Sequence, residues 1–231
     1  MPAALAGCLL TIDDGLVDRA RDAGADASSS GCPAGAVFCD DFESGGLSKW
    51  TWRSDDLATY ASVVDDPTAP GNRVLRIDAP AMDHEWSTMA ADEATVAPSS
   101  DLELSFRLFV STAIGEIFPF GVTFANDYQV AYRLGSSHTL CEQRGKPLFF
   151  AYDVPKAPSG AWSSVRIAIH RAKAYADVAI GSSSRRVPAS GTLVGGGDLT
   201  TTKLTMVVGV FYAPKDASWS GLVDDVVVRS L

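Results

Sequence analysis

The chain has 231 residues, of which 46% are hydrophobic and 20% are charged, and its formal net charge at pH 7 is −9. This length supports one ordinary hydrophobic core, and the acidic balance argues against nucleic-acid binding, which requires clustered positive charge. No window reaches the roughly 18 consecutive apolar residues that a transmembrane helix needs. A net negative charge of this kind is typical of exported proteins, which it helps to keep soluble.

The first feature along the chain is the tetrapeptide Leu5-Ala6-Gly7-Cys8. It resembles the lipobox of bacterial lipoproteins, in which the cysteine is acylated and becomes the mature N-terminus. The residues before it lack the basic segment and the full apolar stretch of a signal peptide, and the alternative is an ordinary buried cysteine. The resemblance implies lipidation at Cys8 and export. The protein would then be an extracellular or outer-membrane lipoprotein that meets the membrane only through its lipid.

An acidic segment rich in small residues follows, from Thr11 to Gly31. It contains too few large apolar side chains to offset the entropy lost on ordering. We therefore predict that residues 1–31 form a lipobox remnant and a flexible acidic linker. Residues 32–231 are expected to form a single folded domain.

Three further cysteines, Cys32, Cys39 and Cys141, lie in the predicted domain. In an oxidising compartment Cys32 and Cys39 can close a small loop at the entrance of the first strand, which leaves Cys141 unpaired. The rival pairing joins Cys39 to Cys141. Closeness in sequence favours the first pairing, but sequence alone does not decide the connectivity.

Alternating apolar and polar residues dominate the domain and predict β-strands. Leu102, Leu104, Phe106, Leu108 and Val110 share one face, for example. About a dozen such segments and no helical pattern of useful length predict an all-β, antiparallel jelly-roll β-sandwich of about twelve strands. The other predicted strands are 36–42, 58–64, 73–79, 87–90, 118–124, 128–132, 147–152, 165–169, 174–180, 203–211 and 221–229.

Four segments resemble, in order and spacing, the concanavalin A-like lectin/glucanase superfamily, which includes laminin-G-like modules. They match its first strand, the turn that enters its next strand, a late strand that opens with tryptophan, and its closing strand. Together they cover the chain from about residue 37 to residue 229 and imply the jelly-roll fold. The segments are Phe38-Cys39-Asp40-Asp41-Phe42, Gly71-Asn72-Arg73, Ala161-Trp162-Ser163 and Gly221-Leu222-Val223-Asp224.

The resemblance also implies a structural calcium ion (Ca²⁺). In related glucanases a closing aspartate, matched by Asp224, and a carbonyl in the Gly-Asn turn, matched by Gly71, bind this ion. The first and last strands commonly lie side by side in the superfamily, so Asp41 is the expected third ligand. Carboxylate and carbonyl oxygens are the ligands that Ca²⁺ prefers. The alternative is that these acids cap turns and pair with nearby arginines.

The catalytic motifs of the superfamily are absent from the sequence. Its glucanases carry Glu-x-Asp-x-Glu on one strand, and the nearest match here is Asp101-x-Glu103. Its alginate lyases carry Gln-x-His, and here alanine follows Gln129-Val130. A histidine such as His170 can serve as a general base, but more often it is an ordinary surface residue. We therefore assign no catalytic residue.

The outward polar face remains as a candidate binding surface. If residues 103–109, 123–133 and 164–170 lie in one sheet, its concave face displays several cations, which suit an anionic glycan. We predict a monomeric, non-catalytic carbohydrate-binding module that binds a polysaccharide there. The alternatives are a polysaccharide lyase or glycoside hydrolase with a non-standard site, or a structural envelope lipoprotein. The predicted ligand-binding residues are Arg107, Gln129, Arg133, Arg166 and His170.

Overall fold

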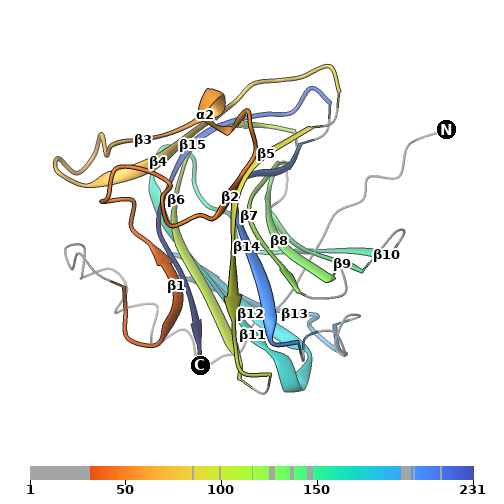
Figure 1. Ribbon diagram of the computed structural model, residues 1–231. Helices are drawn as coiled ribbons and strands as arrows, with labels where there is room; N and C mark the ends of the chain where they lie inside the picture. Colours follow the sequence, from red (N-terminus) through yellow and green to blue (C-terminus); the bar gives the residue numbers. More distant parts are fainter. Residues whose placement is uncertain are drawn as a thin grey trace.

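The fold is a sandwich of two antiparallel β-sheets, as the alternation predicted (Figure 1). The computed structural model describes residues 32–84, 86–98, 100–115, 117–124, 128–135, 138–144, 148–193, 199, 201–213 and 215–231. The predicted lipidation site Cys8 and the predicted linker therefore lie outside the described residues. In the part that is described, none of the helices has the length and apolar composition that a membrane span requires.

The first sheet has eight strands in the order β13-β12-β11-β6-β15-β4-β3, and β1 pairs with β15 beside this path. Its strands are β1 (Ala36–Asp40), β3 (Ala61–Asp65), β4 (Arg73–Ala79), β6 (Leu102–Ile114), β11 (Trp162–His170), β12 (Tyr175–Ile180), β13 (Ser183–Val187) and β15 (Ser218–Ser230).

The second sheet has seven strands in the order β10-β9-β8-β7-β14-β5-β2. Two short helices, α2 (Leu57–Tyr60) and the 3₁₀-helix Arg171–Lys173, complete the described elements. The strands of the second sheet are β2 (Trp52–Arg53), β5 (Trp86–Thr95), β7 (Ile117–Phe124), β8 (Tyr128–Leu134), β9 (Thr139–Arg144), β10 (Leu148–Asp153) and β14 (Lys203–Ala213).

The hydrophobic core lies between the two sheets, where their apolar faces meet. Phe106 of the first sheet packs against Phe120 of the second with 4.8 Å between ring centroids, and Tyr132 lies 6.0 Å from the same ring. Phe106 and Ile167 are 2% and 1% exposed, so the alternation assigned the inner faces of their strands correctly. Burial of these side chains contributes roughly 2 kcal/mol each to the free energy of folding.

The chain crosses from the first sheet to the second between β6 and β7. Gly115 has φ +77°, a conformation that costs glycine little, and a Cβ added there would lie 2.7 Å from the Cβ of Ala217. A larger residue would therefore be strained and would collide with the neighbouring segment. Because of this turn, β6 and β7 lie in different layers although they follow each other directly in sequence.

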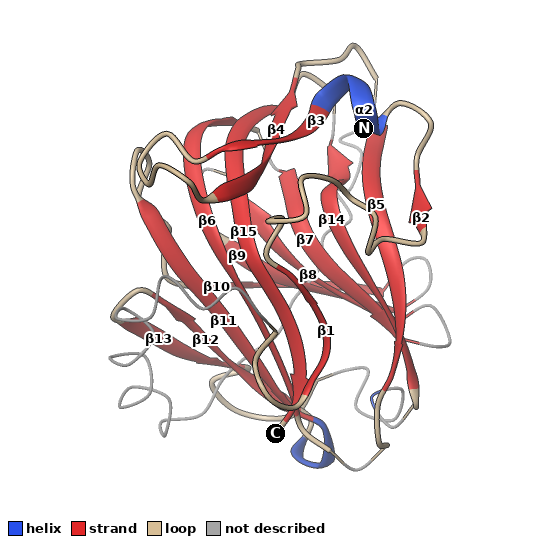
Figure 2. Ribbon diagram, turned by 60° about the vertical axis from the view of Figure 1, so that its left-hand side comes forward, coloured by secondary structure: helices blue, strands red, loops and turns tan. Residues whose placement is uncertain are grey.

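The first and last strands lie side by side, as the resemblance implied. β1 pairs antiparallel with β15, with Asp40 opposite Val226 (Figure 2). Strands β2, β9 and β13 lie outside the predicted set, and the helix α2 occupies the start of the strand predicted at 58–64.

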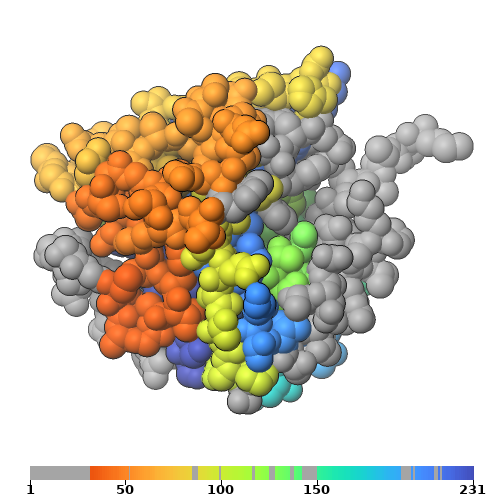
Figure 3. Space-filling model, viewed as in Figure 1, coloured from red at the N-terminus to blue at the C-terminus, as the bar shows by residue number. Residues whose placement is uncertain are grey.

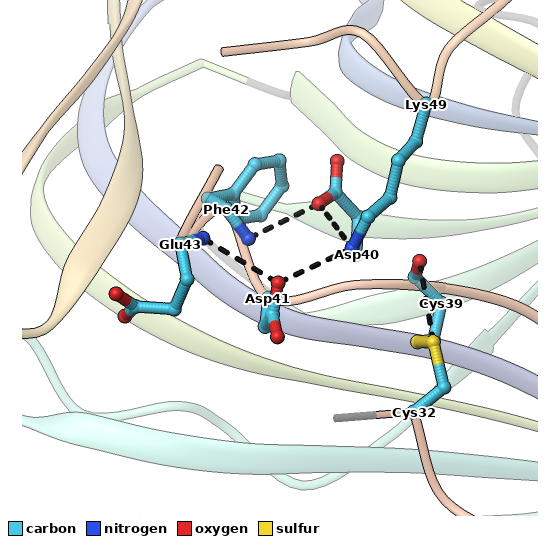
Figure 4. The surroundings of a disulfide bond; sticks show 7 residues. All are labelled: Cys32, Cys39, Asp40, Asp41, Phe42, Glu43 and Lys49. Atoms are coloured by element: carbon cyan, nitrogen blue, oxygen red, sulfur yellow. Dashed lines mark hydrogen bonds and ion pairs between the residues drawn. A yellow bond between two sulfur atoms is a disulfide. The ribbon is translucent and has the colours of Figure 1, made fainter. Parts of the chain in front are cut away.

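The disulfide predicted between Cys32 and Cys39 is present, and Cys141 is a free, buried cysteine. Figure 4 shows the bond, which joins the segment before β1 to Cys39 near the end of that strand, close to the point where Asp40 and Asp41 contact Lys49. The bond restrains the chain where it enters the first sheet.

Replacing both Cys32 and Cys39 by serine should lower the free energy of unfolding by about 2 kcal/mol, because the bond closes a short loop that the unfolded chain would otherwise leave open. Urea unfolding of the oxidised protein and of the double variant measures the difference. The matched control is reduction of the wild-type protein, which should reproduce the loss. A double variant as stable as the oxidised protein would contradict a stabilising role.

Candidate functional site

The five residues predicted to bind a ligand lie in two different sheets. Arg107 lies in β6, and Arg166 and His170 lie in β11, all in the first sheet. Gln129 and Arg133 lie in β8 of the second sheet. The premise that the three segments share one sheet is therefore wrong. Alternation shows which residues of a strand share a face, but it does not show which sheet the strand joins.

The predicted arginines of the first sheet, Arg107 and Arg166, are engaged in ion pairs on its outer face, the face turned away from the second sheet. Arg166 donates to Glu103, whose carboxylate also pairs with Arg229. Glu103 is 2% exposed although it stands on the outer face. A buried carboxylate requires such partners, so Arg166 and Arg229 are held by Glu103 rather than left for a ligand.

His170 lies between two carboxylates at the end of β11. Its Nδ1 lies 2.8 Å from Oδ2 of Asp101, and its Nε2 lies 3.3 Å from Oδ2 of Asp177. Asp177 is fully buried and also pairs with Arg186 at 3.2 Å. The imidazole packs against Tyr175 with 4.6 Å between ring centroids. These contacts connect β11 with β12, β13 and the residue before β6. His170 therefore holds neighbouring strands together.

Arg133 and Gln129 lie on the outer face of the second sheet. Arg133 is 8% exposed, and its Nε donates to Oγ1 of Thr139 at 2.6 Å, which ties β8 to β9. Gln129 is half-buried. The other four predicted residues are basic residues that are buried or paired with carboxylates. Gln129 is the one that remains as a candidate for contact with a ligand.

Strand register aligns small residues in one row across the outer face of the second sheet. At Gly121 an added Cβ would lie 3.1 Å from the Cβ of Ala131, so the row admits little side-chain volume at its centre. Most members are buried. This small-residue row runs from β5 to β10 in the order Ala91, Val207, Gly121, Ala131, Cys141 and Ala151.

The next row on the same face carries hydroxyl, amide and carboxylate groups. Thr205, Thr123 and Gln129 are half-buried and Glu93 is exposed. Figure 3 shows β5 in yellow-green, β14 in blue and β7 in green side by side at the surface. We call Glu93, Thr205, Thr123 and Gln129, which the register aligns from β5 to β8, the polar row.

The sequence prediction missed Glu93, Thr123 and Thr205. Each strand shows its own alternation, but a row exists only once the register between neighbouring strands is known. The register here depends on the long-range pairing of β14 with β5 and β7. The only sequence signal is the polar residue between apolar neighbours in each strand, and most strands of a sandwich share that signal.

Two tryptophans lie on opposite sides of the first sheet. Trp50 is 1% exposed and lies in the core, and its Nε1 donates to Asp40 at 2.7 Å. Trp162 is half-exposed on the outer face of the first sheet, where it packs against Phe109. Its position at the start of β11 places it on the opposite face from Val165.

The residues expected to bind Ca²⁺ have other partners. Asp41 pairs with Lys49 at 3.2 Å, as Figure 4 shows. Gly71, with φ +90°, lies in the turn that precedes β4. Oδ2 of Asp224 accepts hydrogen bonds from Arg107 and from Asn72, both at 3.0 Å.

Asp224 is buried and already has a cationic partner, Arg107. Burial raises the pKa of Asp224 to about 6, against the lowering effect of the Asn72 hydrogen bond, and burial likewise raises the pKa of Asp225. The guanidinium of Arg107 occupies the position beside the Asp224 carboxylate that a cation would take. No group of three or more His, Cys, Asp or Glu side chains in the described ranges is arranged to hold a metal. The residues as arranged do not fit a calcium site.

Comparisons with known proteins identify the fold but no family. No family model and no curated protein matches the chain. A pseudo β-1,3-glucanase and immunostimulatory antigen of Mycobacterium tuberculosis is similar over 86% of this chain and 100% of its own, with TM-score 0.56 and 14% identity. The globular domain of T. cruzi calreticulin is similar over 85% of this chain and 88% of its own, with TM-score 0.58 and 12% identity.

A larger protein shares the fold in part. A sialidase of Trypanosoma rangeli, solved with 2,3-difluorosialic acid, matches 93% of this chain with TM-score 0.52 and 12% identity, and the chain spans 36% of that protein. At these identities the matches establish the architecture alone. That architecture is the jelly-roll sandwich of the lectin and glucanase folds, as the sequence motifs implied.

Proposed function

We propose that the protein binds a polysaccharide along the polar row of the second sheet and does not cleave it. The observation that carries this proposal is the in-register row of half-buried Thr205, Thr123 and Gln129 beside the small-residue row. Hydroxyl and amide groups both donate and accept hydrogen bonds, as sugar hydroxyls do. The row advances about 4.8 Å per strand, so it offers contacts at regular intervals to an extended chain.

A neutral polysaccharide fits this surface better than the anionic glycan expected from the sequence. Arg107 and Arg166 are held in ion pairs on the other sheet. Arg133 is buried beneath the surface and bonded to Thr139. The carboxylate in the polar row, that of Glu93, is paired with Lys203 at 3.1 Å, so this lysine is also held in an ion pair rather than left for an anionic ligand.

The structural neighbours support a sugar-related role without determining it. They include a protein described as a pseudo β-1,3-glucanase and a sialidase bound to a sugar analogue. The absence of Glu-x-Asp-x-Glu from the sequence, together with the structural use of His170, favours binding without turnover. Release of reducing ends or unsaturated sugars from a polysaccharide panel would instead support the alternative of a lyase or hydrolase.

The proposed cellular setting is export with attachment to a membrane through a lipid on Cys8. The Cys32–Cys39 disulfide supports this setting, because such bonds persist outside the reducing cytoplasm. Cys8→Ser in the full chain should shift the protein from the membrane fraction to the soluble fraction. Wild-type protein found only in the soluble fraction of cells would contradict the anchor.

Replacing Gln129 by alanine and Thr123 by valine together should weaken polysaccharide binding about tenfold or more, because each change removes a hydrogen bond of about 1 kcal/mol. Isothermal titration with soluble neutral β-glucans and with alginate measures affinity and charge preference. The matched control is Ser184→Ala, an exposed hydroxyl on the outer face of the first sheet. Unchanged affinity in the double variant, or binding of alginate alone, would contradict the assigned surface.

A further inference from the structure

A closed ring of side-chain contacts lies on the outer face of the first sheet. Arg107 of β6 donates from Nη1 to Oδ2 of Asp224 in β15 at 3.0 Å, and its guanidinium lies over the ring of Trp162, 4.5 Å from the centroid. Nε1 of Trp162 donates to Oγ1 of Thr68 at 2.9 Å. These contacts hold the turn before β4 against three strands of the sheet.

The rest of the ring runs through that turn. Oγ1 and the backbone N–H of Thr68 both donate to Oδ1 of Asp66, at 2.8 and 2.7 Å. Nδ2 of Asn72 donates to Oδ2 of Asp66 at 3.4 Å and to Oδ2 of Asp224 at 3.0 Å. Asp66 and Asp224 are 3% and 1% exposed, so two buried carboxylates face each other across one amide.

A buried carboxylate requires hydrogen-bond donors or a compensating positive charge. Asp66 accepts from Thr68 and Asn72. Asp224 has the Arg107 guanidinium, whose Nη1 lies 3.0 Å from Oδ2 of Asp224 and 3.7 Å from Oδ2 of the exposed Asp225. A guanidinium remains charged at any physiological pH, and its flat face stacks on an aromatic ring while its edge meets a carboxylate. Arg107 makes both contacts at once.

We propose that Arg107 is a built-in cation that neutralises Asp224 and Asp225 and ties the 66–72 turn to the sheet, in place of a bound divalent metal. The protein therefore needs no calcium for its fold. Removing the guanidinium vacates a position lined by oxygen atoms of two aspartates, where water can complete the six to eight oxygen ligands that Ca²⁺ takes. The Arg107→Ala variant thus acquires a cation dependence that the wild-type protein lacks.

The test compares melting temperatures in EDTA and in millimolar CaCl₂. The wild-type midpoint should be the same in both solutions. Arg107→Ala should melt roughly 5 °C lower in EDTA, and CaCl₂ should raise its midpoint by at least about 2 °C. The matched control is Arg76→Ala, because Arg76 also pairs with an aspartate on this face, at 2.6 Å from Asp78, and should show no response to calcium.

Terbium luminescence gives a second and local readout. A Tb³⁺ ion at the vacated position would lie beside Trp162, so excitation of tryptophan should produce terbium emission in Arg107→Ala and not in wild type. The emission should disappear in Arg107→Ala combined with Asp224→Asn.

Two results would overturn the proposal. One is a wild-type protein that calcium stabilises or EDTA destabilises. This result is measured on the wild-type protein alone and does not depend on whether a variant folds. The other is a folded Arg107→Ala protein with neither terbium emission nor a calcium response. The variant Arg107→Lys covers the case in which the alanine variant does not fold. It keeps the positive charge, so it should fold and give no terbium emission. Terbium emission from this variant would also contradict the inference.

Discussion

Replacing Arg171 by alanine is expected to lower the free energy of unfolding by about 3–5 kcal/mol. Arg171 is 2% exposed and begins the 3₁₀-helix that joins β11 to β12. Its guanidinium donates to backbone carbonyls in two other connections, namely those of Ala97, Leu199 and Thr201. Its own backbone N–H donates to Asp101 at 2.9 Å.

The size of the effect follows from what the substitution leaves behind. The carbonyls that Arg171 bonds belong to the segment between β5 and β6 and to the residues just before β14. Without the guanidinium they lose donors at a position that water does not reach freely, and each unsatisfied group costs about 1–3 kcal/mol. Arg171→Lys should recover only part of the loss, since one ammonium group cannot reach three separated carbonyls.

Urea unfolding followed by tryptophan fluorescence measures these differences. The matched control is Arg185→Ala, an exposed arginine of β13 whose removal should change stability by less than about 0.5 kcal/mol. A loss of similar size in both alanine variants would show that charge removal in general, rather than the carbonyl contacts of Arg171, causes the effect.

Acidification from pH 7 to pH 4 is expected to remove about 3 kcal/mol of stability through His138. His138 is 8% exposed, and neither ring nitrogen has a hydrogen-bond partner among the described residues. Burial, helped by the positive charge of Lys156, lowers its pKa from 6.5 to about 4. The neighbouring ring of Tyr132, 6.0 Å away between centroids, is also buried.

The direction of the effect follows from proton counting. Between pH 4 and 6.5 the unfolded chain carries a proton on His138 and the folded protein does not. Stability therefore rises with pH across this window and is fully present above 6.5. Asp224 acts in the opposite sense, since its folded pKa of about 6 exceeds its ordinary value of 3.8 and its contribution falls as pH rises between these values.

Comparison with His138→Leu isolates the histidine, because both proteins share Asp224. The difference in free energy of unfolding, wild type minus variant, should increase by about 3 kcal/mol between pH 4 and pH 7. His84→Gln is the control, since His84 is exposed, and it should leave the pH profile close to that of wild type. A pH-independent difference for the leucine variant would show that His138 is not buried in its neutral form.

The sequence was sufficient for the fold class because the apolar faces repeat with period two over long strands. In β6 and β11 the residues that the alternation placed inside are buried, and Glu103 and Ala168 are buried on the outer face as well. The pairing of β1 with β15 and the Cys32–Cys39 bond were also predicted, the first from a family resemblance and the second from closeness in the chain.

The candidate site could not be predicted in the same way. Arg107 and Arg133 look equivalent in sequence, since each stands between apolar neighbours on a strand. The structure places them in different layers, because the chain changes sheet at Gly115 between them. Arg107 also finds its partner Asp224 more than a hundred residues away, a separation of 117 along the chain. A contact between residues so far apart leaves no pattern in the neighbouring sequence from which it could be predicted.

The position of β15 has a consequence for synthesis. This strand lies between β6 and β4 and is also the partner of β1, yet a ribosome makes it after all the other strands that the structure describes. Until it emerges, β1 has no neighbour, and β4 and β6 have nothing between them. The first sheet of a nascent chain therefore cannot close until β15 has been made, and molecular chaperones that shield exposed strand edges have a longer opportunity to act on this sheet than on the second.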